Sequence, residues 1–140
     1  MDNMYINMLP MASTSTDTMI LGTGVDIAEV ARIRGALENP RTGERFRARV
    51  YTAEEITYCA KRRNGHESFA ARFAAKEAMM KALGQAFGWR EIEVVRGSGA
   101  PTIRLHGRAA AHAEQLGMRR IHLSLSHTAE LAIAYVVAES

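Results

Sequence analysis

Residues 68–84 read Ser68-Phe-Ala-Ala-Arg-Phe-Ala-Ala-Lys-Glu-Ala-Met-Met-Lys-Ala-Leu-Gly84, and this stretch decides the fold. Its residues are strong helix formers and a glycine closes it, so it predicts a helix over about residues 67–83. Phe69, Phe73 and Met80 recur at spacings that keep them near one face. The alanines between them leave the helix thin, so that another backbone can approach it closely.

Four charged side chains interrupt the small and apolar surface of this helix: Arg72, Lys76, Glu77 and Lys81. A carboxylate among cations on a closely packed helix suits a site that binds a metal ion and phosphates together. The alternative is a solvated face, on which Glu77 and Lys81 form an i to i+4 pair worth about 0.2–0.5 kcal/mol. Periodicity alone leaves both interpretations open.

A second motif lies upstream, in Ile20-Leu-Gly-Thr-Gly-Val-Asp-Ile27. It predicts a short buried strand near 20–26 that is broken by two glycines and ends at Asp26, followed by a helix near 28–38. A short carboxylate in this position is also typical of a helix N-cap, which is the alternative for Asp26. The pair Gly22-x-Gly24 is too short for a dinucleotide fingerprint.

Together the two motifs resemble the holo-acyl-carrier-protein synthase family, which comprises small, single-domain phosphopantetheinyl transferases. The resemblance runs from about Met19 to the C-terminus. It is carried by Gly24-x-Asp26, Arg32, the run Arg72–Gly84 and the closing segment Ile121-His-Leu-Ser-Leu-Ser-His127-Thr128. It implies an α+β fold with a small antiparallel sheet packed against helices.

The resemblance also implies an enzyme that transfers 4′-phosphopantetheine from coenzyme A to a serine of an acidic apo acyl carrier protein and releases adenosine 3′,5′-bisphosphate. The carrier would serve fatty-acid or polyketide synthesis. Asp26 and Glu77 match the family's ligands for Mg²⁺, for which Mn²⁺ can substitute, and Lys81 completes the catalytic set by binding phosphate. Asp26, Glu77 or a water activated beside them takes the serine proton, and we favour the water.

Further site residues follow from the same resemblance. Arg72, Lys76, Lys81 and His127 match positions near the coenzyme. Arg72 would reach a neighbouring subunit, because the family is typically homotrimeric with interfacial sites. The surface that faces the carrier protein would consist of Arg32, Arg45, Phe46 and Arg49. The alternatives are solvated surface for the charged residues and a structural hydrogen bond for His127.

One connection departs from the family. Many members have a longer glycine-rich loop after the motif helix, whereas this chain has Gly84-Gln-Ala-Phe-Gly-Trp89. The departure bears on coenzyme affinity and subunit contacts rather than on the reaction class.

Composition limits the remaining choices. The chain has 140 residues, 47% of them hydrophobic, which suits one domain, and no apolar run is long enough to span a membrane. The single cysteine, Cys59, indicates a reducing compartment, and we expect a cytoplasmic protein. Residues 1–18 are polar, rich in methionine and without periodicity, so we expect a disordered leader, with Met19 as the natural start and residues 19–140 as the domain.

The net charge of +3 and the arginines between residues 32 and 49 suit a polyanionic partner. Aromatic residues for base stacking are nearly absent there, which argues against single-stranded nucleic acid. Two less favoured functions remain: a coenzyme A-binding module without turnover, and a small basic nucleic-acid-binding protein. The other elements that we expect are a helix at 52–62 opened by a capping box at Thr52 and Glu55, a helix at 107–116, and strands at 91–96, 102–106, 121–126 and 131–138 that complete one sheet.

Overall fold

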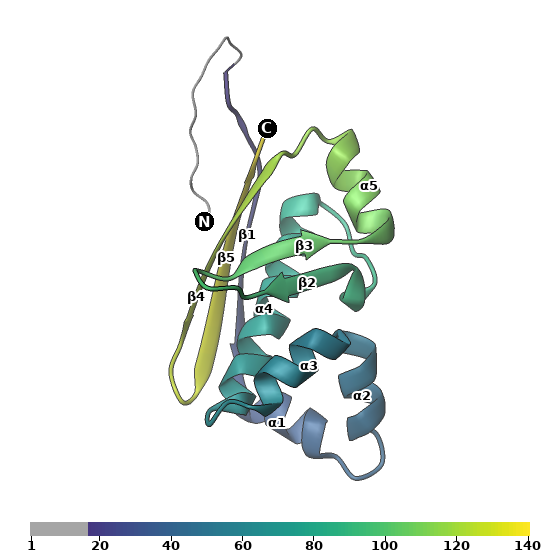
Figure 1. Cartoon of the computed structure of the whole chain (residues 1–140), viewed down its shortest axis with the longest axis vertical. Coiled ribbons are helices and arrows are strands. Elements are labelled where there is room, and N and C mark those ends of the chain that lie inside the picture. Colours follow the sequence, from purple (N-terminus) through teal and green to yellow (C-terminus); the bar gives the residue numbers. More distant parts are fainter. Residues whose placement is uncertain (1–16) are drawn as a thin grey trace.

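A computed structural model describes residues 17–140, which form two antiparallel sheets and five α-helices (Figure 1). The elements in chain order are β1 (Ile20–Glu29), α1 (Val30–Glu38), α2 (Gly43–Val50), α3 (Ala53–Ala60), α4 (Gly65–Leu83), the 3₁₀ helix η1 (Trp89–Glu91), β2 (Ile92–Val95), β3 (Thr102–Leu105), α5 (Gly107–Gln115), β4 (Arg120–His127) and β5 (Leu131–Glu139). The α+β fold is therefore confirmed.

Helix α4 is the centre of the molecule. Figure 1 shows it between the long sheet on one side and the β2–β3 hairpin with α3 on the other. Most of its residues are buried, and Gly84 ends it in the left-handed conformation, with its N–H donating to the carbonyls of Met80 and Lys81. Burial extends to Arg72 and Lys76, so the solvated-face interpretation is wrong for these two residues.

Strand β1 crosses α4 with backbone against backbone. A Cβ atom on Gly24 would lie 1.8 Å from the carbonyl oxygen of Ala78, and one on Gly22 would lie 2.2 Å from that of Ala82. Only glycine fits at these two positions. The predicted close approach of another backbone to the thin helix is therefore present. This approach brings the part of β1 that follows Gly24 next to α4.

The ends of the first helices differ from the prediction. Strand β1 continues to Glu29, which pairs with Leu131, so α1 begins at Val30 and Asp26 lies within the strand. The N-cap interpretation of Asp26 is thus wrong. Residues 43–50, for which we expected no helix, form α2.

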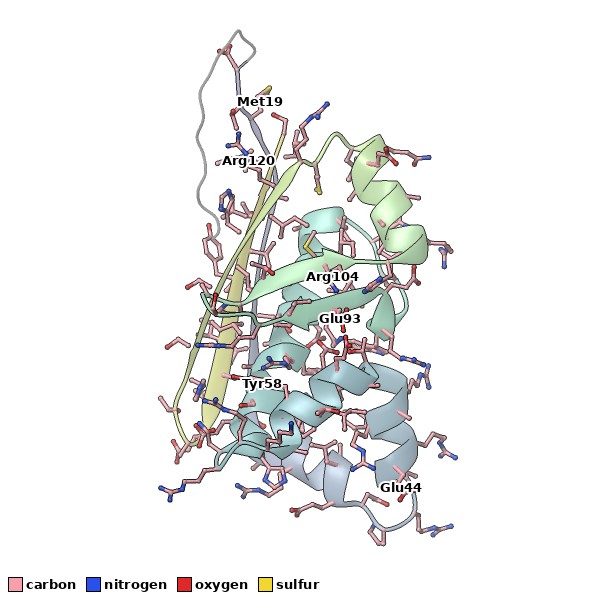
Figure 2. The ribbon with its side chains drawn as sticks, in the orientation of Figure 1. Met19, Glu44, Tyr58, Glu93, Arg104 and Arg120 are labelled. Carbon is pink, nitrogen blue, oxygen red and sulfur yellow. The ribbon has the colours of Figure 1, made fainter. Side chains whose placement is uncertain are left out.

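The predicted capping box opens α3. The Thr52 hydroxyl accepts from the Glu55 N–H, and the Glu55 carboxylate accepts from the Thr52 N–H. The same hydroxyl donates to Glu93, at 2.8 Å, and Figure 2 shows Glu93 where β2 meets the helices. The capping residue therefore also ties α3 to the hairpin.

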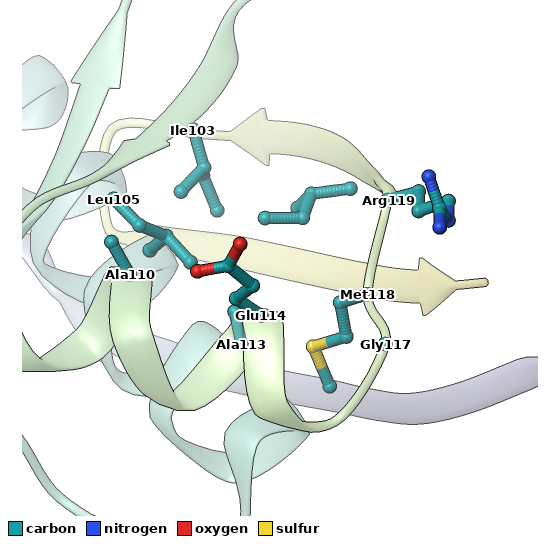
Figure 3. A pocket seen from close by; sticks show the side chains of 9 residues that line it. Ile103, Leu105, Ala110, Ala113, Glu114, Gly117, Met118 and Arg119 are labelled. Atoms are coloured by element: carbon teal, nitrogen blue, oxygen red, sulfur yellow. The ribbon is translucent and has the colours of Figure 1, made fainter.

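The strands form two sheets rather than the single one that we expected. The order in the larger sheet is β1-β5-β4, and β2 pairs only with β3. Between the edges of β3 and β4 lies a hollow of about 530 Å³, lined by apolar side chains such as Ile103, Leu105 and Ile121, with the Glu114 carboxylate directed into it (Figure 3). The two sheets therefore meet around this hollow through side chains, without backbone hydrogen bonds between β3 and β4.

Within residues 17–140, none of the helices has the length and apolar character needed to cross a membrane. The predicted leader, residues 1–18, falls outside the described residues except for 17 and 18.

Candidate active site

Asp26 and Glu77 meet between β1 and α4. Asp26 is two residues after Gly24 and so shares the face of β1 that lies against α4. Glu77 precedes Ala78, whose carbonyl contacts Gly24. The two carboxyl groups lie close enough to share a hydrogen bond when Glu77 is protonated. The structure thus brings together the two residues that the sequence predicts as metal ligands.

This arrangement changes the acidity of Glu77. Burial of the carboxyl, followed by the hydrogen bond and the negative charge of Asp26, raises the pKa of Glu77 from 4.5 to about 7. The positive charges of Lys81 and Arg32 oppose this shift. Two carboxylates held together in this way repel each other, so a cation between them would be stabilised.

Lys81, the third predicted catalytic residue, lies beside the two carboxyl groups. Lys81 Nζ donates to Oδ1 of Asp26 and to the carbonyl oxygen of Val25, both at 3.1 Å. Its ion pair is therefore with Asp26 across the helix–strand contact, rather than with Glu77 along the helix. Because the Lys81 side chain is 57% exposed, its ammonium group can also contact a ligand.

The donor set fits a magnesium ion. Within residues 17–140 no cluster of three or more His, Cys, Asp or Glu side chains is placed to hold a metal. Magnesium is commonly held by one or two carboxylates, with waters and substrate phosphates as the other ligands. Asp26 and Glu77 supply that number of carboxylates, and the exposed Lys81 lies beside them for a phosphate.

Arg72 and His127, predicted near the coenzyme, line a separate cavity of about 270 Å³. The Arg72 side chain is buried, and its guanidinium group lies 4.3 Å from the centre of the Tyr58 ring. Among the described residues, its Nε has no hydrogen-bond partner. A buried donor without a partner is costly, so this atom is available for an acceptor on a ligand. The polar residues that line the cavity are Tyr58, Arg62, Ser68, Arg72, Arg96, Ser124 and His127.

This cavity and the carboxylate pair lie on different faces of α4. Arg72 and Glu77 are five residues apart, which corresponds to about 140° of rotation and about 7.5 Å along the helix axis. One chain therefore presents two separate groups of charged side chains on α4.

Lys76 requires a correction. Its ammonium group is fully buried and donates to Oε1 of Glu55 at 2.8 Å and to the carbonyl oxygens of Trp89 and Ile92. Burial lowers the pKa of Lys76, and the ion pair with Glu55 opposes that shift. With all its contacts internal, Lys76 cannot reach a coenzyme, and the predicted contact is wrong. It holds α4 against α3 and the hairpin instead.

The residues predicted to face a carrier protein lie on α1 and α2. Arg32 is exposed on α1, and its charge acts on Glu77. Arg45 and Arg49 are exposed on α2, one turn apart and hence on the same face. Phe46 is half-buried, with its ring 6.3 Å from that of Phe73 on α4.

Two contacts at the Arg72 cavity were missed by the sequence analysis. Glu67 Oε1 lies 2.8 Å from Nδ1 of His127 and fixes the orientation of that ring. Arg62, at the end of the helix that we expected over residues 52–62 but beyond the observed end of α3, lies over the ring of Tyr58 and lines the cavity. The basic run Lys61-Arg-Arg63 was the available signal.

Proteins of similar sequence and similar fold are holo-[acyl-carrier-protein] synthases. A holo-[acyl-carrier-protein] synthase of Koribacter versatilis (strain Ellin345) is 52% identical over 126 residues, covering 86% of this chain and 99% of the relative. The crystal structure of the Neisseria meningitidis synthase matches with a TM-score of 0.75 at 32% identity, over 87% of this chain and 100% of that one. The Bacillus anthracis str. Ames synthase, solved in complex with CoA (3′,5′-ADP), matches with a TM-score of 0.70 at 34% identity, over 87% and 98%. The family model of the 4′-phosphopantetheinyl transferase superfamily matches residues 22–136, and this chain therefore belongs to that superfamily.

Proposed function

We propose that this chain is a holo-acyl-carrier-protein synthase, which transfers 4′-phosphopantetheine from coenzyme A to a serine of an apo acyl carrier protein. The observation that carries the proposal is the convergence of Asp26, Glu77 and Lys81 from β1 and α4. Two carboxylates and an exposed ammonium group in one place suit a diphosphate and its counter-ion.

Asp26 and Glu77 would hold the magnesium ion. When bound, it supplies positive charge that polarises the diphosphate and orients it for in-line attack. Burial and the neighbouring Asp26 raise the pKa of Glu77, and the repulsion from Asp26 supports this assignment because a divalent cation would relieve it. Manganese, which also prefers oxygen ligands, would substitute.

The protein's own side chains supply the remaining chemistry. Lys81 contacts the diphosphate and stabilises the charge that develops on the leaving bisphosphate. A water that donates a hydrogen bond to the carboxylate of Asp26 or Glu77 accepts the proton of the attacking serine hydroxyl and passes one of its own protons to that carboxylate.

Arg72 and His127 would bind an anionic part of the coenzyme that reaches them from the site of a neighbouring subunit. The support is the unpartnered Nε of Arg72 and its separation from Glu77 around α4. A homotrimer would unite the two groups of side chains. The outer face of the larger sheet suits burial against another copy, because it exposes Val25, Ile27, Leu131, Ile133 and Tyr135.

The carrier protein would dock on Arg32, Arg45, Phe46 and Arg49. Acidic carriers complement this basic surface, and exposed charges mainly accelerate encounter and set orientation. The carrier of fatty-acid synthesis is the substrate that we propose. The buried, free Cys59, whose pKa burial raises to about 11, supports a reducing, cytoplasmic setting.

The test is the intact mass of an apo acyl carrier protein after incubation with this chain, coenzyme A and Mg²⁺. We expect the carrier to gain one phosphopantetheine group. Asp26→Ala and Glu77→Ala should abolish the gain, whereas Glu54→Ala, which removes an exposed carboxylate from α3, should not. Coenzyme binding without any mass gain would indicate a binding module and would overturn the proposal.

A further inference from the structure

A third hollow, of about 630 Å³, lies away from the carboxylate pair and the Arg72 cavity. Its walls come from the end of α2, from the 84–89 connection in which this chain departs from the family, from η1 and β2, and from the residue before α5. The lining side chains that matter here are Arg49, Phe87, Trp89, Arg90, Glu93 and His106.

The acidic groups of this hollow already have partners. Glu93, labelled in Figure 2, accepts from the Thr52 hydroxyl and lies 2.9 Å from Nε2 of His106. Glu91 accepts from the backbone N–H groups of Gly88 and Ala109. These contacts hold the floor of the hollow in place and satisfy its carboxylates with hydrogen bonds, which lower the pKa of both Glu91 and Glu93 and keep them ionised.

The arginines at the rim differ from these carboxylates in their contacts. Arg49 and Arg90 are exposed, and neither makes an ion pair or a side-chain hydrogen bond with another residue in the 17–140 range. A third guanidinium group, that of Arg108, lies over the ring of Phe87 at 5.6 Å. The rim of the hollow therefore offers exposed guanidinium groups to an anionic partner, while the carboxylates on its floor are held by internal hydrogen bonds.

Aromatic stacking connects this hollow to the reaction centre. The rings of Trp89 and Phe73 are stacked with their centres 4.9 Å apart, and Phe73 also faces Phe46 of the predicted carrier surface. Phe73 and Glu77 are four residues apart on α4, so they lie on the same side of the helix, about 6 Å apart along its axis. Trp89 thus stacks on a residue that lies about one helical turn from Glu77.

We propose that this hollow is part of the docking surface for the acidic carrier protein, and that Trp89 and Arg90 determine how tightly that carrier binds. The inference rests on the proposed function, because it takes the carrier as the partner. Charge complementarity and continuity with Arg45, Phe46 and Arg49 favour an acidic protein over a second copy of this basic chain. Tryptophan and arginine are also the residue types that contribute most to binding at protein interfaces.

The chain offers a direct probe, because Trp89 is its only tryptophan. We would titrate the full chain, without coenzyme A, with an apo acyl carrier protein that lacks tryptophan and follow the emission of Trp89. We expect a saturable change in emission. The Kd for the carrier protein should rise about ten-fold or more in Arg90→Glu, because a steering charge is reversed. The matched control is Arg119→Glu, which reverses an exposed arginine beside the other hollow and should bind as the wild type does.

Steady-state kinetics give the second readout. Arg90→Glu and Trp89→Phe should raise the KM for the carrier protein and leave the KM for coenzyme A unchanged. If Arg90→Glu modifies the carrier protein with the wild-type KM, the inference is overturned and the proposed function stands. A binding defect in Arg90→Glu together with no phosphopantetheine transfer by the wild type supports the docking surface and overturns the proposed function. An unchanged Trp89 emission with normal modification overturns the docking surface alone.

Discussion

Lys81 Nζ lies 3.1 Å from Oδ1 of Asp26, although the two residues are 55 positions apart in the chain. The contact exists because β1 passes directly over α4, with Gly24 against the carbonyl of Ala78. One cation and two carboxylates thereby occupy a junction between a strand and a helix, and each can be tested separately.

Removing the ammonium group of Lys81 should impair turnover. We expect Lys81→Ala to lower kcat by about 10²-fold or more, since a group that stabilises developing charge is typically worth that much. Steady-state assays at saturating coenzyme A and carrier protein measure this. Lys61→Ala, which removes an exposed lysine from the segment before α4, is the control and should retain wild-type kcat. An unimpaired Lys81→Ala enzyme would remove this residue from the catalytic set.

The raised pKa of Glu77 makes stability depend on pH in a defined direction. The folded chain holds this proton up to about pH 7, whereas the unfolded chain releases it near pH 4.5, so the favourable contribution is present below pH 4.5 and is lost as pH rises through 7. In the absence of metal, Glu77→Gln should match the wild-type Tm near pH 4 and exceed it above pH 7.

The size of that difference should be about 2–4 °C, because the carboxyl is partly exposed and solvent screens it. Thermal unfolding in the presence of a chelator measures it. Adding Mg²⁺ should reverse the order at high pH by stabilising only the chain that retains both carboxylates. Equal Tm values for the two proteins at every pH would show that the carboxyl groups do not interact.

Gly24 should tolerate no side chain. Gly24→Ala places a Cβ 1.8 Å from the Ala78 carbonyl oxygen, so strand and helix must separate, at a cost of about 1–3 kcal/mol or more in unfolding free energy. Asp26 moves away with the strand, so activity should fall further than stability. Urea unfolding and kinetics on the same sample check both effects.

The control for that substitution is Gly35→Ala on α1, where an added Cβ meets no atom within 4 Å. A glycine-to-alanine change at such a compatible site should stabilise the chain by about 0.4–1 kcal/mol. If the two variants behaved alike, the backbone contact would not be what sets the site.

The buried ion pair predicts a purely structural defect at Lys76. Lys76→Met leaves the Glu55 carboxylate buried without its cation and should reduce the unfolding free energy by about 3–5 kcal/mol. The KM for coenzyme A of the protein that still folds should not change. Lys61→Met should stay within about 0.5 kcal/mol of the wild type. A raised KM for coenzyme A in Lys76→Met would restore the ligand contact that the structure excludes.

Local signals in the sequence predicted most of the elements. Helix α4 follows from its composition and its closing glycine, and α3 follows from the capping box of Thr52 and Glu55. Helix α2 was missed because four of its eight residues are charged and few are apolar, so no buried face is visible in the sequence. The separation into two sheets depends on packing between β3 and β4, which no local pattern contains.

The site was less accessible to sequence reasoning. Asp26 and Glu77 each had an ordinary local interpretation, and only the resemblance to a family paired them. Lys76 was misplaced because its counter-ion, Glu55, is 21 positions away, and periodicity places a lysine on the surface by default. Glu67 was missed for the same reason, since His127 lies 60 positions further along the chain.

The two glycine contacts between β1 and α4 separate the demands of architecture from those of chemistry. Gly22 and Gly24 hold the crossing in place whether or not a reaction occurs there, while the role that we propose for Asp26 and Glu77 is in turnover. A descendant of this chain could therefore lose both acids, keep both glycines and persist as a well-folded protein with no catalytic role. Inspecting these four positions in any newly sequenced homologue would distinguish such an inactive copy from a working one.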